Sequence, residues 1–131
     1  MHLKLTTGAP GIGIECYSSQ LMDEIVGTYL VHVMDLFCAL KAANVTFVSV
    51  LGPAPNRGFA HFGPTFLRLQ KFIARQHEKH GIPYVDVTDR TASPTGVLLP
   101  DFLPEHERDF VHANTRWGME VAHEVVRILK L

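Results

Sequence analysis

The stretch at residues 45–51, Val-Thr-Phe-Val-Ser-Val-Leu, is the feature that most constrains what this chain can fold into. It is short, almost continuously apolar and rich in Val and Phe. Such a composition is typical of a strand that is buried on both faces of a parallel sheet. The stretch therefore predicts a sheet whose two faces are both covered by other elements.

Helical patterns lie on both sides of this stretch. Apolar residues recur at spacings of three and four between Met22 and Leu40, and Asn44 is expected to end that helix in a left-handed conformation. A second helix is expected to begin with Thr65 as its N-cap and to end at Gly81. Each pattern predicts a helix with one apolar side that can pack on the sheet.

The remaining chain adds two strands, one helix and two loops. Residues 12–17 and 82–87 are predicted strands, and Asn114 is predicted to cap a final amphipathic helix. The Pro- and Gly-rich residues 52–64 and the long segment 88–111 are predicted loops.

The resulting order of elements is typical of α/β proteins. The chain has 131 residues, which is the length of one domain. We expect a single domain, residues 1–131, with a three-layer, flavodoxin-like architecture in which helices cover both faces of a parallel sheet. Ligands bind outside the carboxyl ends of the strands in such sheets, so functional residues are expected in the loops that follow them.

Charge and hydropathy argue against nucleic acid and membranes as partners. The formal net charge is -1, which offers no basis for binding nucleic acid through bulk electrostatics. The apolar residues 25–40 are interrupted by His32 and Asp35, so we expect no membrane span. Cys16 and Cys38 do not form a disulfide framework, and no signal peptide is visible. We therefore expect a protein of a reducing compartment, the cytoplasm.

The candidate chemistry lies just before the last predicted helix, in Asp-Phe-Val-His-Ala-Asn at residues 109–114. An Asp and a His three residues apart can place both side chains on one side of the chain. A carboxylate bonded to one imidazole nitrogen fixes the tautomer, and the other nitrogen can then take a proton from a hydroxyl. Asp109 and His112 are therefore candidate catalytic residues. The same spacing also fits a capping Asp beside an exposed His without catalysis.

Several segments around this pair resemble the SGNH/GDSL hydrolases. They are Val-Asp-Val-Thr-Asp at 85–89, Asp-Phe-Val-His-Ala-Asn-x-x-x-Gly at 109–118, and Lys-Ala-Ala-Asn at 41–44 with the strand and proline loop that follow. The resemblance implies an SGNH hydrolase-like fold and the hydrolysis or transfer of an acyl ester. It implies Asp109 as the triad acid, His112 as the triad base, and neither a metal nor an organic cofactor.

The chain departs from that family at the nucleophile. The family's attacking serine lies in a Gly-Asp-Ser block, and this sequence has none. Aligned on the strand–helix pattern, Ser18 or Ser19 takes the place of the family's oxyanion-hole Asn. Each is a candidate hydrogen-bond donor to an oxyanion or a substitute nucleophile, or else a cap for the first helix. Cys16 is a further candidate nucleophile, or a small buried hydrophobic residue.

Other polar residues are candidates for substrate contact or for metal binding. Asn56 and Arg57 follow the central strand, and with Asn114 they are candidate substrate-binding residues, although Arg57 equally fits a solvent-facing loop. His77 and His80 belong to no paired zinc motif. We interpret them as polar residues at a helix C-terminus and expect no metal site.

The predicted sheet is small for the resembled family. If residues 12–17 correspond to the family's third strand, two strands and a helix are missing on the N-terminal side. One flank of the sheet would then carry unpaired backbone groups and bare apolar surface. We therefore expect an open sheet edge that suits a second copy of the chain or a complementing chain.

Two functions from different classes follow. One is an esterase or O-acetyl transferase or deacetylase that acts on a small-molecule or sugar ester, with His112 as the base. The other is a non-catalytic SGNH-like binding or accessory domain, or a fragment whose partner supplies the nucleophile. The retained Asp-x-x-His block favours the first function, and the missing Gly-Asp-Ser block favours the second.

Overall fold

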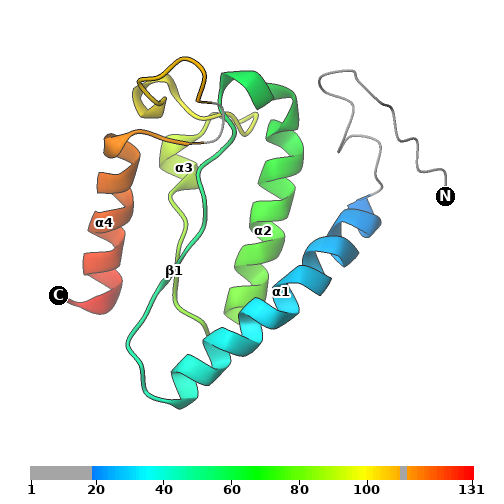
Figure 1. The fold of residues 1–131 in the computed structure, drawn as a ribbon, viewed down its shortest axis with the longest axis vertical. Helices are drawn as coiled ribbons and strands as arrows, with labels where there is room; N and C mark the ends of the chain where they lie inside the picture. Colours follow the sequence, from blue (N-terminus) through cyan, green and yellow to red (C-terminus); the bar gives the residue numbers. More distant parts are fainter. Residues whose placement is uncertain (1–18, 110–111) are drawn as a thin grey trace.

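The computed structural model describes residues 19–109 and 112–131. Figure 1 shows the path of the chain through these elements. In chain order they are helix α1 (Ser19–Ala42), strand β1 (Ser49–Val50), the 3₁₀ segment η2 (Arg57–Phe62), helix α2 (Gly63–Lys79), strand β2 (Tyr84–Val85), helix α3 (Thr88–Thr91), the 3₁₀ turn η3 (Pro100–Phe102) and helix α4 (Thr115–Leu129).

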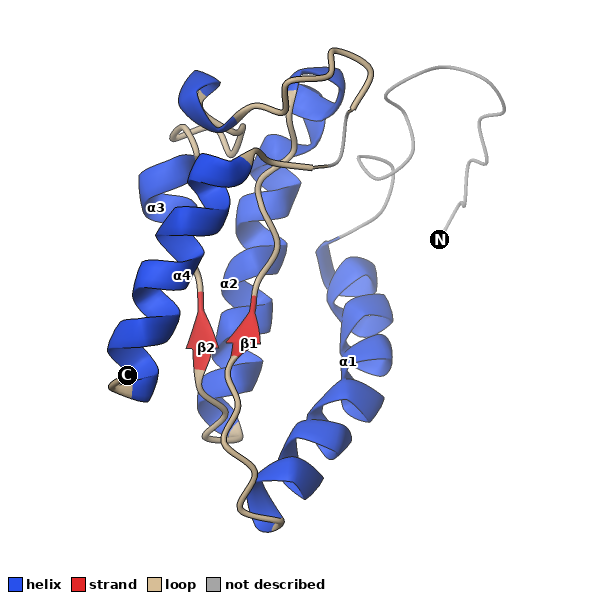
Figure 2. Cartoon of the chain, turned by 60° about the vertical axis from the view of Figure 1, so that its left-hand side comes forward, coloured by secondary structure: helices blue, strands red, loops and turns tan. Residues whose placement is uncertain are grey.

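The two strands form a parallel pair. Ser49 lies opposite Tyr84 in the register, and the N–H of Leu51 donates to the carbonyl oxygen of Val85 at 2.9 Å. Figure 2 shows the strands side by side and pointing in the same direction. Because α2 connects them, the described part of the chain contains a β–α–β unit, which confirms the α/β class and the parallel pairing.

Both strands are shorter than the sequence predicts. Residues 45–51 form a strand only at Ser49–Val50, and residues 82–87 only at Tyr84–Val85. One reason is local, because the N–H of Val45 donates to the carbonyl oxygen of Leu40 at 3.0 Å and so belongs to the helix end. The other is that each strand has a single neighbour in the described residues. The predicted strand at 12–17 lies outside those residues.

Helix α1 ends as the sequence predicts. Asn44 takes a left-handed conformation, with φ at 57°, and its N–H donates to the carbonyl oxygen of Lys41 at 3.0 Å. A left-handed residue after the last turn satisfies carbonyl groups that the helix leaves unpaired. The side chain of Lys41 then donates to the carbonyl oxygen of Gly81 at 3.0 Å, which ties this end of α1 to the end of α2.

Helix α2 begins three residues earlier than predicted, because its N-cap is Phe62 and not Thr65. It starts at Gly63, and the residue before it, Phe62, makes no side-chain cap, so the prediction of Thr65 as N-cap is wrong. Pro64 explains the shift, because a proline in the first turn has no N–H that would need a partner. At the other end Gly81 has φ at 62°, which confirms the predicted stop.

The core lies between α1, α2 and the strands. Leu30 and Met34 of α1 and Ile82 before β2 are its buried centre, and partly buried side chains surround them: Val26, Phe37, Phe47, Phe72 and Ile73. Burial of such apolar side chains is the main force that holds α1 against α2.

His77 is part of this core, which corrects its interpretation as a polar residue of the helix end. Its side chain is buried. Nδ1 lies 2.8 Å from the carbonyl oxygen of Ile73, and Nε2 lies 3.0 Å from the hydroxyl of Ser49. Because a carbonyl can only accept, Nδ1 carries the proton and Nε2 accepts from Ser49. His77 therefore joins α2 to β1.

A second set of apolar side chains faces outward. Tyr29 is 76% exposed, and Ile25 and Leu36 on the same helix are also exposed, as is Val50 of β1. Ile25, Tyr29 and Leu36 lie four and seven residues apart, so they share one side of α1. By length and composition alone, Gln20–Ala42 is able to cross a membrane, so the expectation of no membrane span stays a prediction. Core helices, which are mostly buried, and signal sequences pass the same test, and only 11% of this helix's most apolar window is buried.

The close approach of the turn at residues 93–96 to α2 predicts that Gly96 is needed for stability. Gly96 has φ at 79°, and a Cβ atom there would collide with the carbonyl oxygen of Gly63 at the start of α2. We expect Gly96→Ala to lower the free energy of unfolding by about 2–4 kcal/mol, through the left-handed backbone and the collision. Urea unfolding followed by circular dichroism measures the change.

Gly118→Ala is the matched control. Gly118 lies inside α4, and a Cβ atom there would meet nothing within 4 Å. Since alanine favours a helix interior over glycine, this variant should gain about 0.5–1 kcal/mol. Equal losses in the two variants would contradict the tight approach of the turn to α2.

Candidate active site

Asp109 and His112 form a hydrogen-bonded pair. Nδ1 of His112 lies 3.0 Å from Oδ1 and 3.0 Å from Oδ2 of Asp109, and the backbone N–H of His112 donates to Oδ1 at 3.1 Å. A carboxylate accepts, so Nδ1 carries the proton and Nε2 is the nitrogen able to take another. The side chain of His112 is 74% exposed and that of Asp109 is 27% exposed. The pair therefore presents a basic nitrogen to solvent.

Asn56 holds the loop that carries Asp109. Asn56 follows β1 and is only 2% exposed. Its Nδ2 donates to the carbonyl oxygen of Asp109 at 2.8 Å, and its buried Oδ1 has no partner in the described part of the chain. A buried amide of this kind fixes the backbone it contacts, because losing the bond would leave a desolvated polar group. Asn56 thus lies beneath the pair rather than on the surface.

Asn114 fixes the chain on the other side of His112. Its Oδ1 accepts from the N–H of Trp117 at 3.2 Å, which confirms the predicted cap of α4. Its Nδ2 donates to the carbonyl oxygen of Asp101 at 2.8 Å. Both polar ends of the side chain are therefore used within the protein, and its predicted contact with substrate stays a prediction.

Of the other predicted site residues, Arg57 lines one small hollow together with Asn56 and Asp109. Arg57 is exposed at the start of η2, next to the buried Asn56. Ser19 is the first residue of α1. Ser18 and Cys16 lie outside the described residues. The candidate nucleophiles consequently stay predictions, and the pair Asp109–His112 with its two asparagines is the part of the site that the geometry defines.

A second polar cluster follows β2, and reasoning from sequence missed it. Oδ1 of Asp86 accepts from the N–H of Thr88 at 3.0 Å and from its hydroxyl at 2.5 Å. Gln70 of α2 is 6% exposed, and its Nε2 donates to the carbonyl oxygen of Gly52 at 3.1 Å. The available signal was the Asp-Val-Thr sequence directly after a strand, at the edge where α/β sheets bind ligands.

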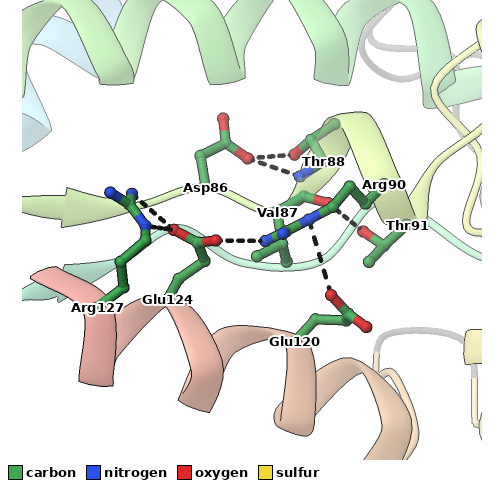
Figure 3. A network of polar contacts seen from close by, with 8 residues as sticks. All are labelled: Asp86, Val87, Thr88, Arg90, Thr91, Glu120, Glu124 and Arg127. Atoms are coloured by element: carbon green, nitrogen blue, oxygen red, sulfur yellow. Dashed lines mark hydrogen bonds and ion pairs between the residues drawn. The ribbon is translucent and has the colours of Figure 1, made fainter.

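An ion-pair network ties α3 to α4. Arg90 lies 3.0 Å from Glu124 and 3.7 Å from Glu120, and Glu124 also pairs with Arg127 at 2.7 Å (Figure 3). The hydrogen bond from Arg127, with a further one from Arg90, lowers the pKa of the Glu124 carboxyl below its ordinary value. Because the pKa of Glu124 is lower in the folded state, its ion pairs stabilise the fold at pH values above the ordinary carboxyl pKa. This stabilisation is lost as the pH falls through the pKa of the folded state.

The fold and the site together define an α/β protein with an exposed Asp–His pair at the loop before its last helix. No group of three or more His, Cys, Asp or Glu side chains suited to a metal ion occurs within residues 19–109 and 112–131. Comparison of the chain with protein-family models, with curated proteins and with solved structures finds no match. The residues of the site and their geometry are therefore what indicates a function.

Asn56 makes a testable prediction about the site. Asn56→Ala removes the bond to the carbonyl oxygen of Asp109 and leaves that group without its buried donor. We expect a loss of about 1–3 kcal/mol in the free energy of unfolding. We also expect faster hydrogen exchange at the amide of His112, whose acceptor is Asp109. Arg57→Ala is the control, since an exposed neighbour should change stability by less than about 0.5 kcal/mol. Unchanged exchange in Asn56→Ala would contradict the positioning of the loop.

Proposed function

We propose that the chain is the acid–base part of an SGNH/GDSL-type hydrolase acting on small-molecule or sugar acyl esters, as an esterase or in O-acetyl transfer or deacetylation. The observation that carries the proposal is the contact between Asp109 and His112, with Nδ1 3.0 Å from both carboxylate oxygens. This is the orientation in which a carboxylate holds a neutral imidazole ready to act as a base.

The proposed chemistry uses His112 twice. Nε2 of His112 takes the proton of a hydroxyl nucleophile while the oxygen of that hydroxyl attacks the ester carbonyl carbon. The imidazolium that forms is stabilised by Asp109, and it then gives its proton to the alkoxide of the departing alcohol. In the second half of the cycle, water or an acceptor alcohol takes the place of the nucleophile and releases the acyl group.

The proposal leaves two possible sources for the nucleophile. Ser18 and Ser19 precede or begin α1, and they remain the internal candidates for a substitute nucleophile or for a donor to the oxyanion. In the alternative arrangement, a partner chain supplies the serine and places it against His112. High exposure of His112 supports either arrangement, because its basic nitrogen is accessible from outside the described fold.

The finer architecture is part of the same proposal. We propose that β1 and β2 belong to a three-layer, flavodoxin-like parallel sheet with helices on both faces. The outward-facing Val50 of β1 supports this arrangement, since a buried central strand would need a further neighbour. We place the reaction in the cytoplasm, because Cys38 is a free, exposed thiol, which suits a reducing compartment.

Hydrolysis of a short-chain nitrophenyl ester tests the catalytic proposal. We expect turnover by the wild-type chain, and a rate lower by about 10²–10⁴-fold in His112→Ala because the general base is lost. Asp109→Asn should also lower the rate, because an amide cannot hold the same tautomer or stabilise the imidazolium. Product absorbance, with buffer and free imidazole as blanks, measures the rates.

His123→Ala is the matched control for this experiment. His123 is an exposed histidine on α4, and the sequence contains eight histidines that can each contribute a weak background. Its removal should leave the rate unchanged. Rates equal to the blanks in the wild type, or equal losses in His112→Ala and His123→Ala, would contradict an active site in this chain and favour the alternative function.

The alternative is a non-catalytic binding or accessory domain, and exposed apolar surface favours it. Exposed apolar side chains lie on α1, where Ile25, Tyr29 and Leu36 share one side, and Val50 of β1 is exposed as well. A large exposed apolar surface on a folded protein marks an interaction site. The occupant we propose is a second copy of the chain or a complementing chain at the open edge of the sheet.

Light scattering after size exclusion tests this alternative. We expect an apparent mass above the 14.6 kDa of one chain, rising with protein concentration. The double variant Tyr29→Ser, Leu36→Ser should shift the equilibrium towards monomer, because each change removes exposed apolar area. Val126→Ser, on the exposed side of α4, is the comparison. A wild-type chain that stays monomeric over a wide concentration range would contradict the open-edge hypothesis.

A further inference from the structure

A hollow lies between α2 and α3, near the polar cluster that follows β2. Its volume is about 490 Å³, which is within the usual range for small-molecule sites. Leu67 of α2 and Ala92 and Pro94 after α3 form apolar walls, and the buried Gln70 and the half-buried Asp86 contribute polar groups. Neither Asp109 nor His112 lines it, so the ester chemistry proposed above does not use this space.

Gln70 has one polar atom to offer to this hollow. Its Nε2 faces three oxygens, of Gly52 at 3.1 Å, of Thr88 at 3.2 Å and of Asp86 at 3.5 Å. The carbonyl oxygen of Gly52 can only accept, so the amide orientation is determined. Oε1 of Gln70 then accepts no hydrogen bond from the described residues. It is not fully enclosed, so water reaches it and a ligand can replace that water.

Asp86 offers a second acceptor to the same space. Its Oδ1 accepts both bonds from Thr88, while Oδ2 takes part in none within the described residues. Figure 3 shows this second oxygen directed away from Thr88. Asp89 also lines the hollow, and the cation that lines it is Lys71 of α2. The hollow thus combines two carboxylates and an amide oxygen with one ammonium group.

We propose that this hollow binds a small organic cation, a primary alkylammonium group attached to an apolar body. An ammonium group carries three N–H donors and no acceptor, which matches Oδ2 of Asp86 and Oε1 of Gln70. The apolar body packs on Leu67, Ala92 and Pro94. The positive charge complements Asp86 and Asp89, and a charge-assisted bond to a half-buried carboxylate is stronger than a neutral one.

A titration followed by amide resonances tests the proposal with the full chain. The probe is n-butylammonium chloride, and n-butanol serves as a neutral analogue of nearly the same shape. We expect saturable shifts at the amides of Asp89, Ala92 and Ser93 with the ammonium, and none with the alcohol at equal concentration. Shifts that never saturate, or equal binding of the alcohol, would overturn a cation site.

Two variants make the test specific. Asp86→Asn keeps an oxygen that accepts from Thr88 but removes the charge, so affinity should fall by about tenfold or more. Asp101→Asn makes the same chemical change at an exposed carboxylate outside the hollow and should leave affinity unchanged. Equal affinities in the wild type and Asp86→Asn would overturn the proposal.

A third variant decides the question if Asp86→Asn does not fold. Lys71→Met removes the positive charge that lines the hollow while Lys71 itself is exposed on α2. Affinity for n-butylammonium should rise at low salt and converge with that of the wild type at high salt, since salt screens exposed charges. An affinity that is unchanged at low salt would count against the cation site. None of these readouts depends on ester hydrolysis.

Discussion

The parallel pairing of β1 with β2 is the constraint on which the rest of the structure depends. Parallel neighbours need a helix to return the chain, and α2 provides it. The buried imidazole of His77 bonds to Ser49 and so holds this helix on the sheet. Because both strands then run in one direction, the loops after Leu51 and Val85 leave from the same edge. Asn56 follows the first of these loops, and the polar cluster of Asp86 and Thr88 follows the second.

Two buried side-chain amides hold those segments. Gln70 donates to the carbonyl oxygen of Gly52, and Asn56 donates to that of Asp109. In each case a residue without charge fixes a backbone group far away in sequence, and the cost of leaving such a group unpaired makes the arrangement rigid. Asn56 therefore holds the backbone of Asp109 from beneath, while the side chain of His112 is exposed to solvent.

Helix α1 has two apolar surfaces, one buried in the core and one exposed to solvent. Leu30 and Met34 turn inward and pack in the core, while Ile25, Tyr29 and Leu36 turn outward. A helix that is apolar on more than one side is typical of the core of a large protein or of a membrane span, and Gln20–Ala42 is long and apolar enough for the second. This surface and the exposed Val50 of β1 are where the partner proposed above would bind.

The sequence by itself determined the long helices α1, α2 and α4, the ends of α1 and α2 and the Asp–His pair, because each of these is local. It did not predict α3, η2 or η3, which lie in the predicted loops. The periodicity of apolar residues predicted α1 and α4. Asn44 and Gly81 predicted where α1 and α2 end. A spacing of three residues was enough to bring Asp109 into contact with His112. The tertiary structure alone decided the short extent of the strands, the start of α2 and the roles of the buried amides. These depend on partners many residues away, whose positions no local pattern encodes, so only the folded chain brings them together.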